Sequence, residues 1–273
     1  MSQWILLRGL TREARHWDAF EAALAAHGLV GADEHAVCID LPGNGAEHAY
    51  ASPRSVLAMM DFVRARAAAL NVRLPCRVLA MSLGAMVATA WAQHHADDIE
   101  RLVLINTSMR PFARMHERLR PAAWPMLARI AMNWPQPERC ETLIYRLTCN
   151  RADTRDADIT QWTGLRRTHG ASASNALRQL AAAARFRASC DAPRCPVLLL
   201  SSAADRLVDP VCSVRIASRW RASHAVHPWA GHDLPHDDAQ WTCRSIAAWL
   251  DEARENESAC DNHVTTNSHL TGT

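Results

Sequence analysis

Short apolar runs alternate with segments of helical periodicity along most of the chain, and this alternation limits the possible folds more than any other feature. Consecutive parallel strands need a crossover connection, which is usually a helix. The sequence therefore predicts an α/β fold, in which a mostly parallel sheet of about six strands carries helices on both faces. We expect strands at 4–8, 36–40, 76–81, 102–106, 197–202 and 224–228, and helices near 14–27, 53–71, 83–96, 210–222 and 239–254.

Two segments depart from this alternation. Residues 109–192 show several helical patterns rich in Arg, Ala, Trp and Met, and a chain of 273 residues suits one domain with such an insertion. Residues 255–273 are polar with few large apolar side chains, and we predict a disordered tail there. The core domain is thus expected to comprise residues 1–108 and 193–254.

Ser82 lies where an apolar run changes directly into a helical pattern, within Val78–Ala85. The small residues Ala80 and Gly84, two before and two after it, permit the sharp strand-to-helix turn that exposes a nucleophilic serine. The following helix would direct its positive end toward an oxyanion formed there. Because short patterns of this kind are common, a serine that merely caps the helix remains the alternative.

A serine nucleophile needs a base, and the base needs a third group that fixes its tautomer. His232 lies in a glycine-containing loop after the last apolar run, and Asp205 directly follows the run at 197–202. The chain order Ser, Asp, His is typical of a fold with this serine turn. Asp209 is a second candidate acid, but it precedes Pro210 and is more typical of a helix cap.

Four short motifs together resemble the α/β-hydrolase superfamily, in the order in which that family has them. The resemblance covers residues 4–108 and 193–252. The motifs are Asp40-Leu41-Pro42-Gly43-Asn44-Gly45, the Ser82 turn, Asp205-Arg206-Leu207-Val208 and Gly231-His232-Asp233. The first apolar run also fits, since it ends in the glycine turn Arg8-Gly9-Leu10. Two positions depart from the family pattern, because Ala80 stands where glycine is usual and Arg8 where histidine is usual.

The resemblance implies a carboxylesterase-like serine hydrolase with a helical lid. It implies Ser82 as nucleophile, His232 as base and Asp205 as orienting acid, with the backbone N–H groups of Leu10 and Leu83 holding the oxyanion. It further implies a strand order of 2-1-3-4-5-6, and residues 109–192 would form the lid. The family's two leading antiparallel strands should be lacking, because only three residues precede the first run.

The expected reaction is cleavage of a small-molecule carboxylic ester or thioester through an acyl-enzyme intermediate, with no cofactor. Two alternatives stay open, because a fold and a triad do not determine a substrate. One is a cofactor-free lyase or perhydrolase that uses the same triad. The other is a non-catalytic ligand-binding member of the fold.

Three residues are candidates for substrate binding. Arg8 lies beside the oxyanion loop, which is the turn after the first strand that contains Gly9 and Leu10. It either binds a substrate carboxylate or caps a strand end. Trp124 and Trp134 either line an apolar cleft or belong to a small core of the lid itself.

The charge of the chain is unevenly distributed. Residues 109–191 contain fourteen arginines and seven acidic residues, a net charge of +7, so that the rest of the chain carries −5 within an overall +2. A basic lid favours an anionic partner, either a carboxylated substrate or an acidic carrier protein, and the resemblance suggests an acyl chain on its carrier protein as an example of the second. The alternative is a solvated arginine face. The arginines considered for this role are Arg110, Arg114, Arg118, Arg139 and Arg146.

The composition of the chain argues against several other classes of protein. The chain contains no lysine, which removes Schiff-base chemistry and phosphate-loop lysines. Nine cysteines without a Cys-x-x-Cys pair argue against a disulfide or zinc framework, and no signal or membrane-spanning segment is evident, so we expect a cytoplasmic enzyme. The arginines are not interleaved with aromatic residues as in nucleic-acid binding. The acidic and histidine residues at 232–238 have the composition of a metal site, but a serine turn needs no metal, and none is expected.

Overall fold

A computed structural model describes residues 3–31 and 35–267, with side chains up to residue 255. Its centre is a six-stranded sheet in the order β2-β1-β3-β4-β5-β6, and all strand pairs in it are parallel. This confirms the predicted fold class and strand order. The strands are β1 Trp4–Leu7, β2 Val37–Cys38, β3 Cys76–Met81, β4 Ile99–Ile105, β5 Val197–Ser202 and β6 Ser223–His227.

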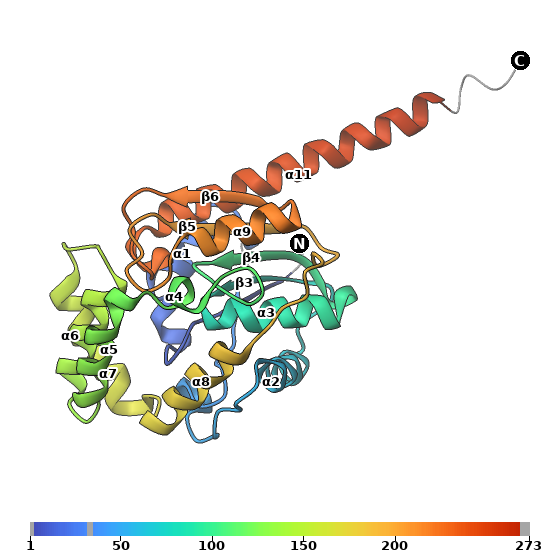
Figure 1. The fold of residues 1–273 in the computed structure, drawn as a ribbon. Coiled ribbons are helices and arrows are strands. Elements are labelled where there is room, and N and C mark those ends of the chain that lie inside the picture. The colour runs from blue at the N-terminus through green and yellow to red at the C-terminus, as the bar shows by residue number, and fades with distance from the viewer. Residues whose placement is uncertain (1–2, 32–34, 268–273) are drawn as a thin grey trace, which may run out of the picture.

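Helices cover both faces of the sheet (Figure 1). Alternate strand residues point to opposite faces, so Leu6 and Leu79 pack with one helical layer, whereas Leu7 and Ala80 pack with the other. Because both faces are buried, the inner strands β1, β3, β4 and β5 are mainly apolar rather than alternating, whereas the edge strand β6 is polar and partly exposed. The first layer is α1 Ala19–Ala26 and α11 Ala239–Asn267, and the second is α2 Val56–Ala69, α3 Leu83–His94 and α9 Val211–Trp220. Short helices in the connections are η1 Ala14–Trp17, η2 Gly45–Glu47, η3 Ala96–Asp98 and α10 Leu234–Asp237.

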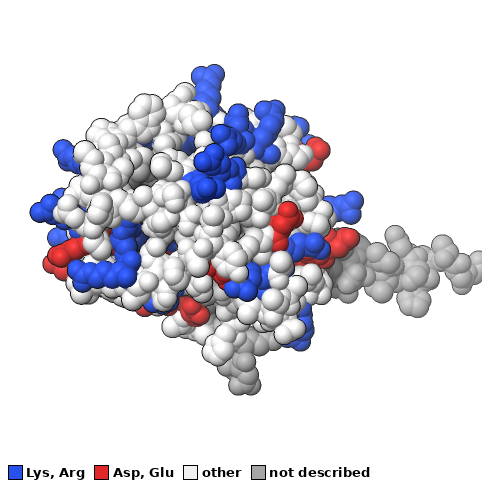
Figure 2. Space-filling view, turned by 90° about the horizontal axis from the view of Figure 1, so that it is seen from below, with Lys and Arg blue, Asp and Glu red and all other residues white. Residues whose placement is uncertain are grey.

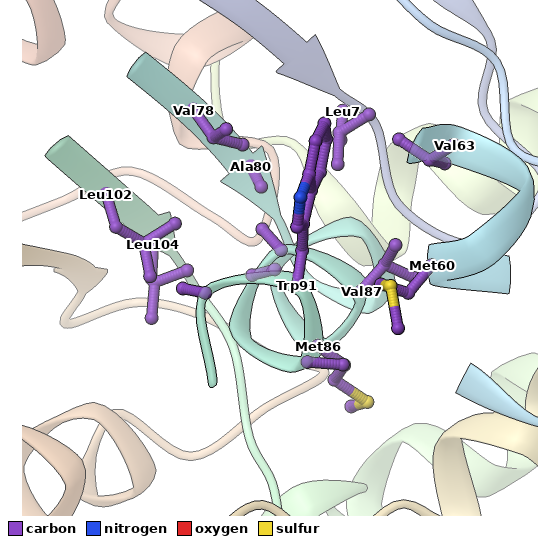
Figure 3. Packing of buried hydrophobic residues seen from close by; sticks show 14 of the residues in the cluster. Leu7, Met60, Val63, Val78, Ala80, Met86, Val87, Trp91, Leu102 and Leu104 are labelled. Atoms are coloured by element: carbon purple, nitrogen blue, oxygen red, sulfur yellow. The ribbon is translucent and has the colours of Figure 1, made fainter. Parts of the chain in front are cut away.

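Trp91 is the central side chain of the larger core. It projects from α3 toward Leu7 and Ala80 of the sheet, with Val63 of α2 beside it (Figure 3). Its indole Nε1–H donates to Asp98 Oδ2 at 2.8 Å, so the one polar atom of this buried ring is satisfied. This packing holds α3, which begins next to Ser82, in one position against the sheet.

Five helices are inserted between β4 and β5, at the end of the sheet toward which the strands point (Figure 1). In this segment α5 packs against α6, α6 packs against α7, and α8 returns to contact α3. The loops that follow all parallel strands also lie at this end of the sheet, which is where α/β sheets bind ligands. The inserted helices are α4 Met115–Arg118, α5 Trp124–Met132, α6 Pro137–Thr148, α7 Arg155–His169 and α8 Ala173–Arg185, with a short turn η4 Pro121–Ala123.

The C-terminal helix is longer than predicted. We expected disorder from residue 255, but α11 continues to Asn267, and residues 268–273 lie outside the described part. The first half of α11 is anchored on the sheet, and a helix that has already started can extend through polar residues without a new nucleation step. Arg254 Nη1 also lies 3.1 Å from Asp251 Oδ1, one turn away. No helix among the described residues is both long and apolar enough to cross a membrane.

Candidate active site

Ser82 occupies the single-residue turn between β3 and α3. Its φ of 53° lies in the left-handed region, a strained conformation that persists where the surroundings enforce it. The turn needs Gly84, because a Cβ there would lie 2.5 Å from Arg8 O and 2.8 Å from Leu7 O. Ala80, by contrast, is a fully buried strand residue whose methyl group packs in the core, so the departure from glycine is accommodated there.

The neighbouring strand β4 and the residues after it hold the serine turn by two hydrogen bonds. The Ser82 N–H donates to Ile105 O at 2.9 Å, and Thr107 Oγ1 donates to Ser82 O at 3.0 Å. Both partners come from the end of β4 and the residues after it. The strained turn is therefore tied to the next strand of the sheet.

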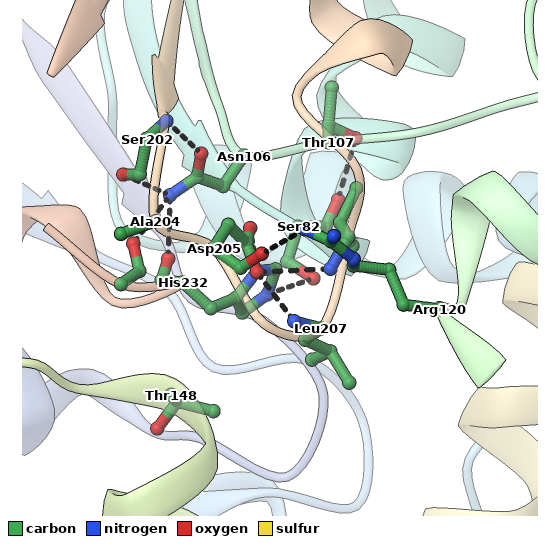
Figure 4. Close-up of polar contacts among 12 residues, drawn as sticks. Ser82, Asn106, Thr107, Arg120, Thr148, Ser202, Ala204, Asp205, Leu207 and His232 are labelled. Carbon is green, nitrogen blue, oxygen red and sulfur yellow. Dashed lines mark hydrogen bonds and ion pairs between the residues drawn. The ribbon is translucent and has the colours of Figure 1, made fainter. Parts of the chain in front are cut away.

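The structure brings Ser82, His232 and Asp205 together in one chain of hydrogen bonds (Figure 4). Ser82 Oγ–H donates to His232 Nε2 at 3.0 Å, and His232 Nδ1–H donates to Asp205 Oδ2 at 2.7 Å. The histidine and the aspartate are buried, whereas Ser82 is partly exposed. An acceptor nitrogen thus faces the serine hydroxyl, which is the arrangement that general-base catalysis requires.

The orientation of Asp205 is fixed by the loop that follows β5. Its Oδ1 accepts the backbone N–H groups of Leu207 at 2.7 Å and Val208 at 3.0 Å, which leaves Oδ2 for His232. Asp209 instead accepts the N–H of Val211 at 3.0 Å, at the beginning of α9. Of the two candidate acids, Asp205 is the one that contacts the histidine.

Sequence reasoning missed Asn106, which supports the histidine loop. Asn106 directly follows β4 and has a φ of 45°. Its Nδ2 donates to His232 O at 2.8 Å, and its Oδ1 accepts the Ser202 N–H at 2.9 Å (Figure 4). The sequence feature that could have pointed to Asn106 is the abrupt change from the apolar run of β4 to the polar residues Asn-Thr-Ser.

Asp237, also missed, joins the histidine loop to the inserted helices. Its carboxylate accepts the N–H groups of Gly231 at 2.6 Å, Asn150 at 2.9 Å and Arg151 at 2.9 Å. The Asp233 N–H donates to Thr148 O at 2.8 Å, at the end of α6. The position of His232 therefore depends on the inserted segment as well as on the sheet.

The two expected oxyanion donors, Leu83 and Leu10, come from segments that adjoin Ser82. Leu83 is the first residue of α3, and the first N–H groups of a helix have no partner within it. Leu10 follows Gly9, which lies against the serine, since a Cβ at Gly9 would be 3.1 Å from Ser82 Cβ and 3.6 Å from Oγ. Both expected oxyanion donors therefore belong to segments in contact with Ser82.

Arg8 has a different partner from the substrate carboxylate that we considered. Its side chain is only 3% exposed, and its Nη2 lies 2.5 Å from Asp233 Oδ2. The guanidinium also lies over the Trp17 ring, at 4.7 Å from the centroid. Arg8 pairs with Asp233 because two loops lie close together: Asp233 directly follows His232 and faces the oxyanion loop. Arg8 thus links these two loops by a buried ion pair.

The pKa of His232 is raised above its ordinary value. Burial lowers this pKa, but the charge and hydrogen bond of Asp205, together with the charge of Asp233, outweigh burial. The positive charge of Arg8 acts in the lowering direction. The imidazolium that would form during proton transfer is therefore stabilised in place.

The raised pKa predicts a pH dependence of activity. Only neutral His232 can accept a proton from Ser82, so kcat/KM should fall as the pH drops through the histidine pKa, with a midpoint above about 6.5. The measurement is kcat/KM between about pH 5 and pH 9. Two esters with different leaving groups should give the same midpoint, because kcat/KM reports the free enzyme. A midpoint below the ordinary histidine value would contradict this prediction.

The two candidate tryptophans of the inserted segment have different surroundings. Trp134 packs in the small core of α5 and α6, and Arg166 lies over its ring at 4.1 Å from the centroid. Trp124 is 53% exposed and lies outside that core. Helical periodicity explains the difference, because Trp124 falls one residue off the buried stripe. That stripe consists of Ala123, Met126, Leu127, Ile130 and, just beyond the helix, Trp134.

The arginines of the inserted segment do not form one uniform surface. Arg118 is buried and caps the end of α8, with Nη2 donating to Ala183 O at 2.6 Å, so it is not available to a partner. The other four that we considered, Arg110, Arg114, Arg139 and Arg146, are exposed. Figure 2 shows one group of arginine side chains on the face that it presents, with further arginines scattered around it, some of them beside acidic side chains. An acidic carrier protein stays a prediction.

Sheet order and the hydrogen-bonded serine, histidine and aspartate together define the class, which is that of the α/β hydrolases. A sequence model of the serine aminopeptidase family, S33, matches residues 5–238, and the chain belongs to this family. A comparison with curated proteins finds no match.

Several solved structures share the fold. An α/β-hydrolase fold protein from Chitinophaga pinensis has a TM-score of 0.70 and 19% identity, covering 92% of this chain and 89% of that one. A thermophilic esterase from Thermogutta terrifontis gives 0.67 and 21%, covering 92% and 90%. The enol-lactonase from Burkholderia xenovorans gives 0.69 and 18%, covering 92% of each chain.

Proposed function

We propose that the protein is a serine hydrolase that cleaves a carboxylic ester or thioester through an acyl-enzyme intermediate. One observation carries this proposal: Ser82 Oγ lies 3.0 Å from His232 Nε2, and His232 Nδ1 lies 2.7 Å from Asp205 Oδ2. The spacing allows the hydroxyl proton to pass to the imidazole as the oxygen attacks a carbonyl carbon.

In the first half of the reaction, Ser82 Oγ bonds to the carbonyl carbon and His232 Nε2 takes its proton. The carbonyl oxygen becomes an oxyanion, which the N–H groups of Leu10 and Leu83 hold. As the carbon–oxygen or carbon–sulfur bond breaks, His232 returns the proton to the leaving alcohol or thiol. The acyl group remains on Ser82 as an ester.

In the second half, His232 takes a proton from water, and the resulting hydroxide attacks the acyl carbon. The bond from carbon to Ser82 Oγ then breaks, and His232 returns the proton to the serine. Asp205 stays ionised throughout and stabilises the imidazolium in each half.

Two of the similar structures are named as an esterase and an enol-lactonase, and this supports an ester as the substrate of the present protein. The family name refers to a peptidase, and the same triad chemistry serves amides. The cofactor-free lyase or perhydrolase and the non-catalytic binding protein remain the alternatives to be tested.

A fluorophosphonate probe and a substrate panel test the proposal. We expect rapid labelling of Ser82 and hydrolysis of p-nitrophenyl esters of increasing chain length, with a maximum that measures the acyl pocket. Matched acyl thioesters and aminoacyl p-nitroanilides complete the panel. A folded protein that neither labels nor hydrolyses any ester would indicate a binding protein, and preferential cleavage of the anilides would indicate a peptidase.

A further inference from the structure

The turn that carries the Leu10 N–H has an unfavourable residue at its third position. The Arg12 N–H donates to Gly9 O at 3.3 Å, which closes a four-residue turn with Leu10 and Thr11 in its centre. Thr11 has a φ of 57°. A turn with a positive φ at this position normally has glycine or asparagine there, and a β-branched side chain is strongly disfavoured. Something outside the turn must therefore hold it.

Two buried side-chain amides hold the turn at Thr11 and Arg12. Gln179 Oε1, on α8 of the inserted segment, accepts the Thr11 N–H at 2.9 Å. Asn44 Nδ2, in the loop after β2, donates to Arg12 O at 2.8 Å. The two amides also bond each other, because Gln179 Nε2 donates to Asn44 Oδ1 at 2.8 Å.

The two amide side chains are buried, and their hydrogen bonds fix their positions. Gln179 is fully buried and Asn44 is 1% exposed. Gln179 Nε2 additionally contacts Ser52 Oγ at 3.1 Å, so each amide has both its oxygen and its nitrogen engaged. A buried polar network in which every group is paired specifies one arrangement of its partners. The strained turn is thus determined by residues from two distant parts of the chain.

We propose that Gln179 and Asn44 are positioning residues that orient the Leu10 N–H toward the oxyanion. The proposal rests on the serine-hydrolase function proposed above. An oxyanion donor acts only at about 2.7–3.1 Å from the developing charge, so a small rotation of the Leu10 peptide removes its contribution. The inserted helix α8 therefore contributes to the rate of the reaction, in addition to any role in covering the site.

Gln179→Met tests the proposal, because it removes the acceptor of the Thr11 N–H while keeping the side chain's length. We expect kcat for a p-nitrophenyl ester to fall about 10- to 100-fold, less than the loss on deleting an oxyanion donor, while KM changes by less than about threefold. A trifluoromethyl ketone, whose adduct places an oxyanion in the same position, should lose affinity by a similar factor. The pH midpoint should not move, because His232 and Asp205 are untouched.

Asn175→Leu is the matched control. Asn175 lies one turn earlier on α8 and also binds the loop after β2, since its Oδ1 accepts the Ser52 N–H at 2.9 Å and its Nδ2 donates to Tyr50 O at 3.0 Å. None of its hydrogen bonds reaches residues 9–12. We expect its Tm to fall as much as that of Gln179→Met, with kcat kept within about twofold of the wild type.

Thr11→Gly provides a rescue. Glycine adopts the left-handed conformation without penalty, so the turn should depend less on Gln179. In the Thr11→Gly background, the kcat loss caused by Gln179→Met should shrink to within about threefold.

Several outcomes would overturn the proposal: a folded Gln179→Met enzyme with wild-type kcat, an equal kcat loss in Asn175→Leu, or no shrinkage of the loss in the Thr11→Gly background. A wild-type protein without esterase activity would instead refute the proposed function itself.

Discussion

Ser82→Ala should lower kcat for ester hydrolysis by at least about a thousandfold, with the fold unchanged, because the serine, histidine and aspartate act as a unit. Alanine removes the attacking oxygen and leaves only the oxyanion donors and substrate binding. The change also removes one hydroxyl from a partly exposed position, so we expect little effect on the free energy of unfolding. The measurements are kcat, fluorophosphonate labelling and Tm on the same preparation.

Ser108→Ala is the control for this variant. Ser108 also lies just beyond a strand, β4, but is only 2% exposed and has no hydrogen bond to His232. Its kcat should stay within a few-fold of the wild type. If Ser82→Ala hydrolyses esters at the wild-type rate, the proposed mechanism is wrong and another nucleophile must act.

Asp205→Asn should have the second largest effect, a kcat loss of about a thousandfold or more. The asparagine oxygen can keep the N–H groups of Leu207 and Val208, which turns its NH₂ group toward His232 Nδ1. The imidazole must then accept at Nδ1 and carry its proton on Nε2, so it cannot take the proton of Ser82. Loss of the carboxylate also lowers the pKa of His232, which reduces the stability of the imidazolium.

Asp209→Asn is the control for the acid, four residues further along the loop. Asp209 accepts a backbone N–H at the beginning of α9 and does not contact His232, so the variant should cost at most about 1 kcal/mol of stability. Its kcat should remain within a few-fold of the wild type. Equal kinetic losses in both variants would overturn the assignment of Asp205.

The sequence alone was sufficient to predict the sheet and the candidate residues Ser82, Asp205 and His232. Strands, helices and the tight serine turn depend on local periodicity and on small residues at fixed offsets, and these are visible in short windows. The strand order came from the resemblance to a family, because neighbouring strands in a sheet are not neighbours in the chain. The roles of the three residues in catalysis remain predictions that the variants above test.

The tertiary structure decided the features that depend on residues far apart in the chain. The partner of Arg8 is Asp233, 225 residues away, and the turn at Thr11 is held by Gln179, 168 residues away. Asn106 reaches the His232 loop across 126 residues. No periodicity or local motif encodes such contacts, since each depends on how two loops meet at the end of the sheet. The sequence thus determined which groups the site contains, and the packing of loops and inserted helices determined which atoms face one another.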